Sequence, residues 1–212
     1  MLHTETIEGK TFQLLKDICK EEQLKDFNLV GGTALALILG HRKSIDLDLF
    51  CPKGFDTAFM NLFLTDKYGF IPTFEAKNTL TGVIDGIKVD FITYPYKLLD
   101  NLIITDDIRL YNYKDICAMK LSAIVGNGTR LKDFVDIAYL STKMSLLEMV
   151  DCYTSKYPNS SAIIPMKAVA YFADIDFSER IMMVDKEFDW SNVEKRITEM
   201  IRYPQRIFSN ML

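Results

Sequence analysis

The stretch GGTALALILGHRKSIDLDLF, residues 31–50, contains the turn, the helix and the strand around which the chain is predicted to fold. The glycine pair is followed by an apolar run of helical length, Thr33–Leu39, and then by alternating residues, Ile45–Phe50, that are typical of a strand. A short apolar strand, Phe27–Val30, directly precedes the glycines. The order of strand, glycine turn, helix and strand predicts a compact unit that combines helix and sheet.

Two aspartates in the alternating strand give the first indication of chemistry. Residues i and i+2 of a strand project from the same face, so Asp46 and Asp48 are expected to point together. Their neighbours Ile45, Leu47 and Leu49 are expected to face the core. The two carboxylates repel each other, and a divalent cation such as Mg²⁺, which binds carboxylate and phosphate oxygens, would resolve the conflict. The alternative is an ordinary polar face on a solvated edge strand.

A third carboxylate lies in another apolar strand. Asp90 is flanked by Lys88, Val89, Phe91 and Ile92, and a carboxylate buried there needs a partner. Three carboxylates that converge from two strands would hold two metal ions, the arrangement that stabilises the attacking and leaving oxygens in nucleotidyl transfer.

The turn Gly31-Gly32-Thr33 lies where a strand passes into a helix. Backbone without side chains lets a phosphate approach the free N–H groups at the start of the helix. Thr33 is expected either to cap that helix or to donate a hydrogen bond to a phosphate. The alternative is a tight turn with no ligand.

Together these residues carry a resemblance to a known family. The stretch from residue 31 to residue 50 resembles the first motif of the nucleotidyltransferase superfamily. It most closely resembles the AbiEii/AbiGii toxin branch, in which GGTALAL, a basic GHR-like element and SxDLDLF run together. The resemblance implies an NTP substrate, bound through two Mg²⁺ ions with Mn²⁺ as the substitute. It also implies site residues: Asp46, Asp48 and Asp90 as metal ligands, and Gly31, Gly32 and Thr33 on the phosphates.

The same resemblance implies a reaction and a biological setting. Asp90 would help to activate the acceptor hydroxyl. Some members of the branch are toxins of toxin–antitoxin or phage-defence pairs, and related enzymes transfer nucleotides to RNA. An antitoxin partner and an RNA acceptor such as tRNA are therefore expected.

The resemblance continues in the second half of the chain. Lys120 and the segment RLKDFVD, Arg130–Asp136, resemble a later basic and acidic motif of the family. Five basic residues between positions 109 and 132 accompany one acidic residue, Asp115, and such a patch would hold a triphosphate. The alternative is a pair of solvated helices with a surface ion pair between Lys132 and Asp136. The predicted functional residues are Lys120, Arg130, Lys132, Asp133 and Asp136.

Two other sets of residues could contact a nucleotide, but each also has another interpretation. Ser44 and Arg42 lie just before the aspartate strand, although His41 and Arg42 look more like solvated loop residues. Aromatic residues near the C-terminus offer a base-stacking surface, but core packing explains them better. They are Tyr171, Phe172, Phe177, Phe188 and Trp190.

The remaining patterns complete the expected architecture. Residues 5–24 predict an amphipathic helix, residues 55–68 predict another, and Asp85-Gly86 predicts a type I′ turn between two strands. After Tyr96 the β signal ends, and five helices are expected. The fold class is therefore α+β: a nucleotidyltransferase-like mixed sheet with flanking helices in residues 1–105, followed by a helical bundle in residues 106–212 that closes over the nucleotide.

Composition sets limits on the class of protein. Of the 212 residues, 49% are hydrophobic and 25% are charged, which is the range of ordinary folded domains. The net charge of −4 argues against general nucleic-acid coating. Only His3 and His41 are present, which argues against histidine-based zinc sites. The most apolar run has twelve residues and no secretory signal is evident, so a cytoplasmic protein without a membrane partner is expected.

Other acceptors and other functions stay open from the sequence. The chemistry would be the same if the acceptor were a small molecule of the antibiotic type or a protein side chain. A protein that binds a nucleotide or a partner without catalysis is a further alternative, although three carboxylates on strands serve little purpose in a binding module.

Overall fold

The structure, a computed structural model, describes residues 2–210 and 212 and contains one mixed sheet of seven strands in the order β3-β4-β5-β2-β1-β7-β6. β1 pairs antiparallel with β2 and parallel with β7, and β2 pairs parallel with β5. The other pairs, β3 with β4, β4 with β5 and β6 with β7, are antiparallel. The strands are β1 (Asn28–Val30), β2 (Leu47–Cys51), β3 (Ile71–Ala76), β4 (Thr79–Ile84), β5 (Ile87–Thr93), β6 (Ile103–Thr105) and β7 (Ile108–Leu110).

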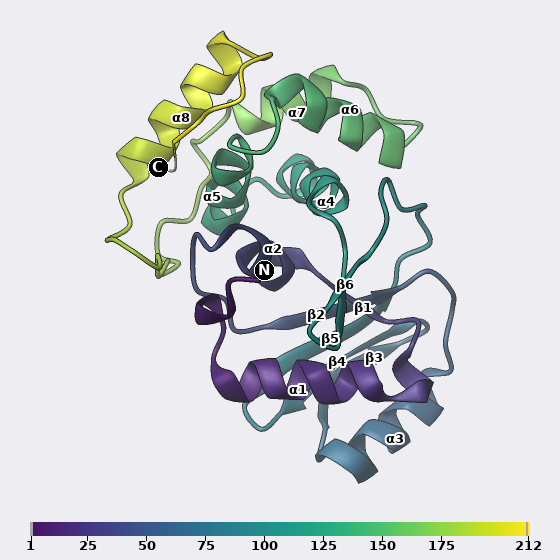
Figure 1. The fold of residues 1–212 in the computed structure, drawn as a ribbon. Helices are drawn as coiled ribbons and strands as arrows, with labels where there is room; N and C mark the ends of the chain where they lie inside the picture. Colours follow the sequence, from purple (N-terminus) through teal and green to yellow (C-terminus); the bar gives the residue numbers. More distant parts are fainter. Residues whose placement is uncertain (1, 211) are drawn as a thin grey trace.

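Helices lie on both sides of the sheet (Figure 1). α1 and α3 lie on one side, whereas α4 and the later helices lie on the other, with α2 between the sheet and the pair α4 and α5. The helices are α1 (Gly9–Lys20), α2 (Gly31–Leu39), α3 (Thr57–Tyr68), α4 (Tyr113–Gly126), α5 (Leu131–Leu140), α6 (Leu146–Lys156), α7 (Ile163–Val169) and α8 (Trp190–Arg202), with short 3-10 turns at Thr4–Thr6 and Glu22–Leu24.

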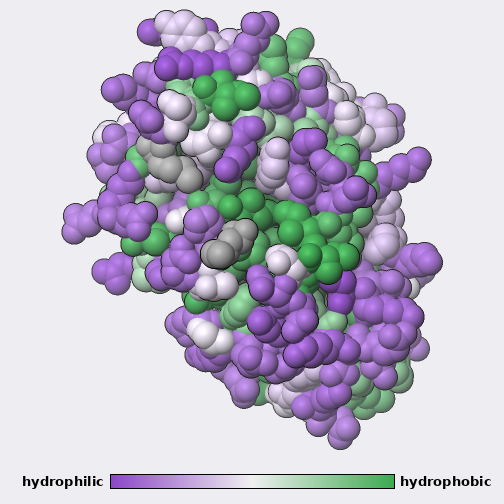
Figure 2. Space-filling view, viewed as in Figure 1, coloured by the Kyte–Doolittle hydropathy of each residue, from purple (hydrophilic) through white to green (hydrophobic). Residues whose placement is uncertain are grey.

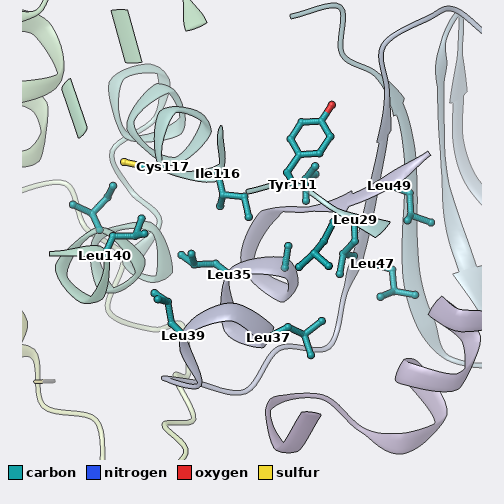
Figure 3. Packing of buried hydrophobic residues seen from close by; sticks show 14 of the residues in the cluster. Leu29, Leu35, Leu37, Leu39, Leu47, Leu49, Tyr111, Ile116, Cys117 and Leu140 are labelled. Atoms are coloured by element: carbon teal, nitrogen blue, oxygen red, sulfur yellow. The ribbon is translucent and has the colours of Figure 1, made fainter. Parts of the chain in front are cut away.

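The central helix α2 joins the sheet and the helical half in one core, because most of its residues are buried. In Figure 3, Leu37 points toward the side of the sheet and α1. Leu35 and Leu39 point the other way, toward the region of Ile116 in α4 and Leu140 in α5. Contacts on both sides fix the position of the helix, and with it the position of the helix N-terminus.

Alternation along β2 and β5 separates the core from a polar face. Leu47, Leu49 and Phe91 are fully buried on one side of the two strands. On the other side, Asp48 lies directly beside Asp90 in the parallel register. Because neighbouring residues in register project from the same face of a sheet, the two carboxylates share the face that looks toward α4.

The strand that carries the two aspartates begins later than predicted. β2 begins at Leu47, so Asp46 lies in the loop just before it. The expectation that Ile45 faces the core is wrong, because its exposed fraction is 54%. Leu47 and Leu49 are buried as predicted.

The expectation that β structure ends near Tyr96 is also wrong. β6 and β7 form a second hairpin, whose turn residues Asp106 and Asp107 have φ of 52° and 65°. Two consecutive residues of positive φ make a type I′ turn, for which Asp is one of the tolerated residues. β7 pairs with β1, so the sheet extends to Leu110 and the expected boundary between residues 105 and 106 falls inside the hairpin.

The main architectural predictions are confirmed. The fold is α+β, five helices follow the sheet among the described residues, and Asp85 and Gly86 both have positive φ in the turn between β4 and β5. Figure 2 shows hydrophilic side chains over most of one face, with hydrophobic ones gathered in a band between α1 and the helices above it. Within residues 2–210 and 212, no helix combines the length and the apolar character needed to span a membrane.

Candidate active site

A cavity of about 620 Å³ lies between the polar face of the sheet and the helical half. The glycine turn, the loop before β2 and β2 itself form one side, and α4 with the first turn of α5 forms the other. A segment between α7 and α8, residues 179–182, completes the wall. The predicted site residues that line it are Gly31, Gly32, Thr33, Arg42, Ser44, Asp46, Asp48, Lys120, Arg130, Lys132 and Asp133.

Asp48 and Asp90 form the acidic centre of this face. Burial, and then the neighbouring charge of Asp90, raise the pKa of Asp48. Asp90 is 9% exposed and forms an ion pair with Lys88, with 2.9 Å between Lys88 Nζ and Asp90 Oδ2. Its other oxygen, Oδ1, is buried and has no hydrogen-bond partner among the described residues. The sequence predicts that Asp90 has a partner without naming it, and the structure supplies Lys88, which satisfies only one oxygen.

The three predicted metal ligands are not gathered into one cluster. Asp46 and Asp48 line the cavity together, whereas Asp90 lies beside Asp48 behind the cavity wall. Across residues 2–210 and 212, no group of three carboxylate, imidazole or thiolate side chains is close enough to bind a metal ion as it stands. The adjacent pair Asp48 and Asp90 nevertheless fits a divalent cation, because the two carboxylates lie in register and one buried oxygen lacks a partner among the described residues.

Neither glycine of the turn leaves room for a Cβ atom, because a side chain from elsewhere in the fold lies close to each of them. Gly31 has φ of +70°, and a Cβ at this position would lie 2.2 Å from Oδ2 of Asp48. A Cβ on Gly32 would lie 2.4 Å from Nη2 of Arg42. The pair therefore lets a carboxylate and a guanidinium group approach the start of α2, whose first residues line the cavity and which has no side-chain cap.

Thr33 and Ser44 contact the loop before β2, and a phosphate contact by either hydroxyl stays a prediction. Thr33 is 1% exposed, makes no cap to α2, and donates its hydroxyl proton to the backbone carbonyl of Asp46. The Ser44 hydroxyl lies 2.8 Å from the Thr33 hydroxyl. These contacts fix the loop that carries Asp46, so both residues are positioning residues.

His41 and Arg42 are not solvated loop residues. Arg42 is 2% exposed and binds Asp136 at two points, with 2.7 Å from Nε to Oδ1 and 2.9 Å from Nη2 to Oδ2. His41, 4% exposed, donates from Nε2 to the same Oδ1 at 2.8 Å. Burial lowers the pKa of His41 despite the neighbouring carboxylate, and its buried Nδ1 has no hydrogen-bond partner among the described residues.

Asp136 is the centre of a buried ion-pair network rather than a cavity residue. Lys120 Nζ lies 2.7 Å from Asp136 Oδ2 and 2.6 Å from Asp133 Oδ1. Burial disfavours the charge of Asp136, but Arg42 and Lys120 together hold its pKa well below the ordinary value. The alternative of a surface ion pair between Lys132 and Asp136 is wrong, because Lys132 has a different partner. Lys132 pairs with Glu179 at 2.8 Å.

Asp133 is the carboxylate of this network that lines the cavity, together with Arg42 and Lys120. Its Oδ1 accepts from Lys120, and its Oδ2 is buried without a partner in the described part of the chain. Burial disfavours the charge of Lys120, yet the two aspartates raise its pKa above the ordinary value. The cavity wall therefore holds a permanently charged ammonium beside a carboxylate with one free oxygen.

The predicted basic patch divides between two places. Lys120, Arg130 and Lys132 line the cavity. Arg109 instead donates to the carbonyls of Cys19, Leu24 and Phe27, and Lys114 pairs with Asp100. Only Lys120, Arg130 and Lys132 thus belong to the site.

The cavity also contains cations that the sequence did not reveal. Lys43 lines it just before β2, and Arg180 lines it from the segment between α7 and α8. This segment is tied to the loop before β2, because Lys43 N–H donates to the Met182 carbonyl and Val184 N–H donates to the His41 carbonyl. No local pattern near residue 180 indicates such a contact, since it depends on pairing between distant segments.

The C-terminal aromatic residues pack together away from the cavity. Phe172 and Phe177 contact Trp190 with ring centroids 5.4 and 5.3 Å apart, and Phe134 joins the cluster. Core packing, the preferred interpretation, is confirmed for Phe172, Phe188 and Trp190, which pack against the core. It is wrong for Tyr171 and Phe177, whose exposed fractions are 54% and 53%. The aromatic residues that do line the cavity are Phe50, Tyr94 and Tyr157, and the sequence did not indicate them.

Comparisons with known proteins agree with this geometry. The family model described as "Nucleotidyl transferase AbiEii toxin, Type IV TA system" matches residues 13–199. The chain belongs to this AbiEii family. It is similar to an uncharacterized protein of Aquifex aeolicus, aq_aa25, with 36% identity over 177 residues that make up 80% of this chain and 84% of that protein.

Solved structures show the same fold as this AbiEii-family chain. JHP933 from Helicobacter pylori superposes with a TM-score of 0.54 at 15% identity, over 94% of this chain and 93% of that one. A candidate nucleotidyltransferase from the same organism gives a TM-score of 0.54 at 14% identity, over 93% and 96% of the two chains. At such low identity the likeness concerns the fold, and the AbiEii assignment depends on the family match.

Proposed function

We propose that this AbiEii-family chain transfers a nucleotidyl group from an NTP to an acceptor hydroxyl in a reaction that depends on a divalent cation. One observation carries the proposal. Asp48 lies in register with Asp90 directly beneath the uncapped start of α2, at the edge of a cavity that also contains several cations. Carboxylates for a metal, N–H groups for phosphates and cations for a triphosphate thus face the same space.

The residues that would hold the cation are Asp48 and Asp90, with Asp46 as the neighbouring carboxylate in the cavity. When bound, Mg²⁺ or Mn²⁺ would neutralise these carboxylates and polarise the phosphate oxygens. The side chains of the chain itself would bind the remaining charge. Lys132 and Arg180, which line the cavity, would contact the β- and γ-phosphates.

The reaction joins the acceptor oxygen to the α-phosphorus and breaks the bond between that phosphorus and the bridging oxygen to the β-phosphate. Pyrophosphate leaves with the charge that the cations have neutralised. The proton of the acceptor hydroxyl passes to one of the two carboxylates that line the cavity, Asp46 or Asp48. Lys120 and Asp136 hold the cavity wall and do not take part in the bond changes.

The family assignment suggests a setting for this activity. The matched family is that of a type IV toxin–antitoxin system, and we propose that nucleotide transfer is the toxic activity and that an antitoxin counteracts it. Induced expression of the chain should then arrest growth. A variant that cannot transfer nucleotides should be tolerated at the same protein level.

A transfer assay tests the proposal directly. The purified chain is incubated with each α-labelled NTP, Mg²⁺ or Mn²⁺, and pools of RNA, small molecules or protein, and label transfer is followed. Asp48→Asn and Asp90→Asn should each reduce transfer at least about 100-fold, because both remove charge from the proposed cation site. The matched control is Asp66→Asn, on the exposed face of α3, which should retain full transfer.

Two outcomes would contradict the proposal. Equal transfer by Asp48→Asn and by Asp66→Asn would remove the metal argument. Binding of an NTP in a titration, with no transfer to any pool in the presence of either metal, would instead favour a nucleotide-binding protein without catalysis.

A further inference from the structure

The cavity changes in character from one end to the other. Around the start of α2 and α5 its wall is charged, with aspartates, lysines and arginines. At the other end, formed by the ends of β2 and β5, by α4 and by the residue after α6, the lining side chains are uncharged. They are Phe50, Tyr94, Ile116, Met119, Ser122 and Tyr157.

Three of these residues, Phe50, Tyr94 and Tyr157, form a continuous surface that we call the aromatic wall. The rings of Phe50 and Tyr94 have centroids 5.2 Å apart and planes inclined by 43°. The hydroxyl groups of Tyr94 and Tyr157 hydrogen-bond to each other. Each of the three side chains is half-buried, so part of each ring packs on the protein and part remains open to the cavity.

Contacts with Lys156 and Tyr96 hold the aromatic wall in place. Lys156 lies with its Nζ 5.4 Å from the ring centroid of Tyr94 and 2.6 Å from Asp115 Oδ1, in an ion pair that has no exposed side-chain surface. Tyr96 packs against both tyrosines, with centroids 4.8 Å from Tyr94 and 5.0 Å from Tyr157. The open ring surfaces are therefore set before any ligand binds, which lowers the entropic cost of stacking.

The aromatic wall lies along the same strands as the carboxylates. Phe50 follows Asp48 by two residues on β2, so the two side chains share a face and lie roughly 7 Å apart along the strand. Tyr94 follows Asp90 in the same way, four residues on, just beyond the end of β5. A ligand with its phosphates at the carboxylates would thus extend over Phe50 first and toward the two tyrosines next.

We propose that the aromatic wall binds the nucleobase of the NTP by stacking, with the triphosphate at the charged end. This inference rests on the proposed function and adds the orientation of the substrate to it. A second phosphate group or a charged acceptor does not suit this end, because its side chains carry no charge and offer few polar groups. A flat ring with a π-face does suit it, and every nucleobase has one.

The same residues indicate weak discrimination among bases. The phenolic groups of Tyr94 and Tyr157 bond each other, so at most one of their two protons is free for a base. Ser122 adds one further hydroxyl at this end. Stacking without a set of fixed hydrogen bonds tolerates purines and pyrimidines alike, so loss of a ring should weaken all NTPs by similar factors.

Isothermal titration with two kinds of probe tests the orientation. ATP, GTP, CTP and UTP contain a base, whereas inorganic tripolyphosphate contains only the charged part, and each is titrated with Mg²⁺ present. Tyr157→Leu should raise the Kd for every NTP that the wild type binds by about tenfold, while the Kd for tripolyphosphate changes by less than about twofold. Tyr157→Phe keeps the ring and should retain most of the NTP affinity.

A second variant and a control make the test independent of folding. Ser122→Phe leaves the aromatic wall intact but fills the space in front of it, and it should weaken NTP binding and spare tripolyphosphate. Tyr171→Leu removes a ring that is 54% exposed and lies outside the cavity, and should change neither Kd. Thermal melting curves confirm that each variant is folded.

The possible failures are distinguishable. If Tyr157→Leu and Ser122→Phe bind NTPs as tightly as the wild type does, the aromatic wall is not the base site. If they weaken NTPs and tripolyphosphate equally, the stacking proposal is likewise overturned. If the wild type binds neither an NTP nor tripolyphosphate, the proposed function itself fails.

Discussion

Arg42 and Asp136, separated by 94 positions in the sequence, form a buried two-point ion pair with distances of 2.7 and 2.9 Å. The pair joins the loop that precedes the aspartate strand to helix α5. Lys120 and His41 complete the coordination of the same carboxylate. The acidic face of the sheet and the basic face of the helical half are thereby held at a fixed separation, which defines the cavity between them.

Removal of the Asp136 charge should destabilise the whole chain. Asp136→Asn would leave Arg42 and Lys120 buried without their shared anion, at a cost of about 3 kcal/mol, equivalent to roughly 6–12 °C in Tm for a protein of this size. Thermal unfolding by circular dichroism measures the difference. Asp66→Asn, on exposed α3, serves as the control and should melt like the wild type. Equal Tm values for the two variants would show that the network does not stabilise the fold.

The stabilisation by Asp136 should depend on pH in a defined direction. The pKa of Asp136 is well below its ordinary value in the folded protein, so its stabilising effect is present above the unfolded pKa and is lost as the pH falls toward the folded pKa. The difference in Tm between wild type and Asp136→Asn should stay constant from pH 7 to about 5 and shrink below about 4. A difference that grows on acidification would contradict this assignment.

Removal of the Asp48 charge should raise stability and abolish activity. Its pKa is raised by burial and by Asp90, so ionisation of Asp48 opposes folding as the pH rises through the folded pKa. In EDTA at pH 7, Asp48→Asn should therefore melt at a higher temperature than the wild type, while it loses nucleotide transfer. Near pH 3.5 the two proteins should converge, because both side chains are then largely uncharged. A lower Tm for Asp48→Asn at pH 7 would contradict the prediction.

Gly31 and Gly69, two of the glycines of positive φ at helix ends, allow a matched comparison. Gly31→Ala places a Cβ 2.2 Å from Oδ2 of Asp48, whereas Gly69→Ala, at φ of +63°, places a Cβ in open space. Both should lose about 1 kcal/mol from the left-handed backbone, but only Gly31→Ala should displace the carboxylate and lose transfer activity. Tm and transfer rate are measured for both. Retained activity in a folded Gly31→Ala protein would show that the close approach to Asp48 is not required.

Much of the fold follows from local sequence. The alternation around Asp48, the helical run after Gly32 and the positive φ at Asp85 and Gly86 each depend on residues within a few positions, and the structure confirms them. The hairpin around Asp106 was missed because each of its strands has only three residues. Three residues are too few to show alternation, and the hairpin is stabilised by pairing of β7 with distant β1.

In the candidate site, too, some features follow from local sequence and others only from tertiary packing. The sequence by itself indicated the carboxylates, the glycine turn and the basic residues of α4 and α5, because residue type and spacing suffice to predict their chemistry. Only the tertiary structure decided their roles: it buried Arg42 against Asp136, turned the Thr33 hydroxyl to the Asp46 loop, and brought Arg180 to the cavity. Tyr94 and Tyr157 meet for the same reason. A short-range pattern predicts toward which face of a strand or helix a side chain points. Contacts between residues that are tens of positions apart depend on how whole elements pack, and local spacing does not determine that packing.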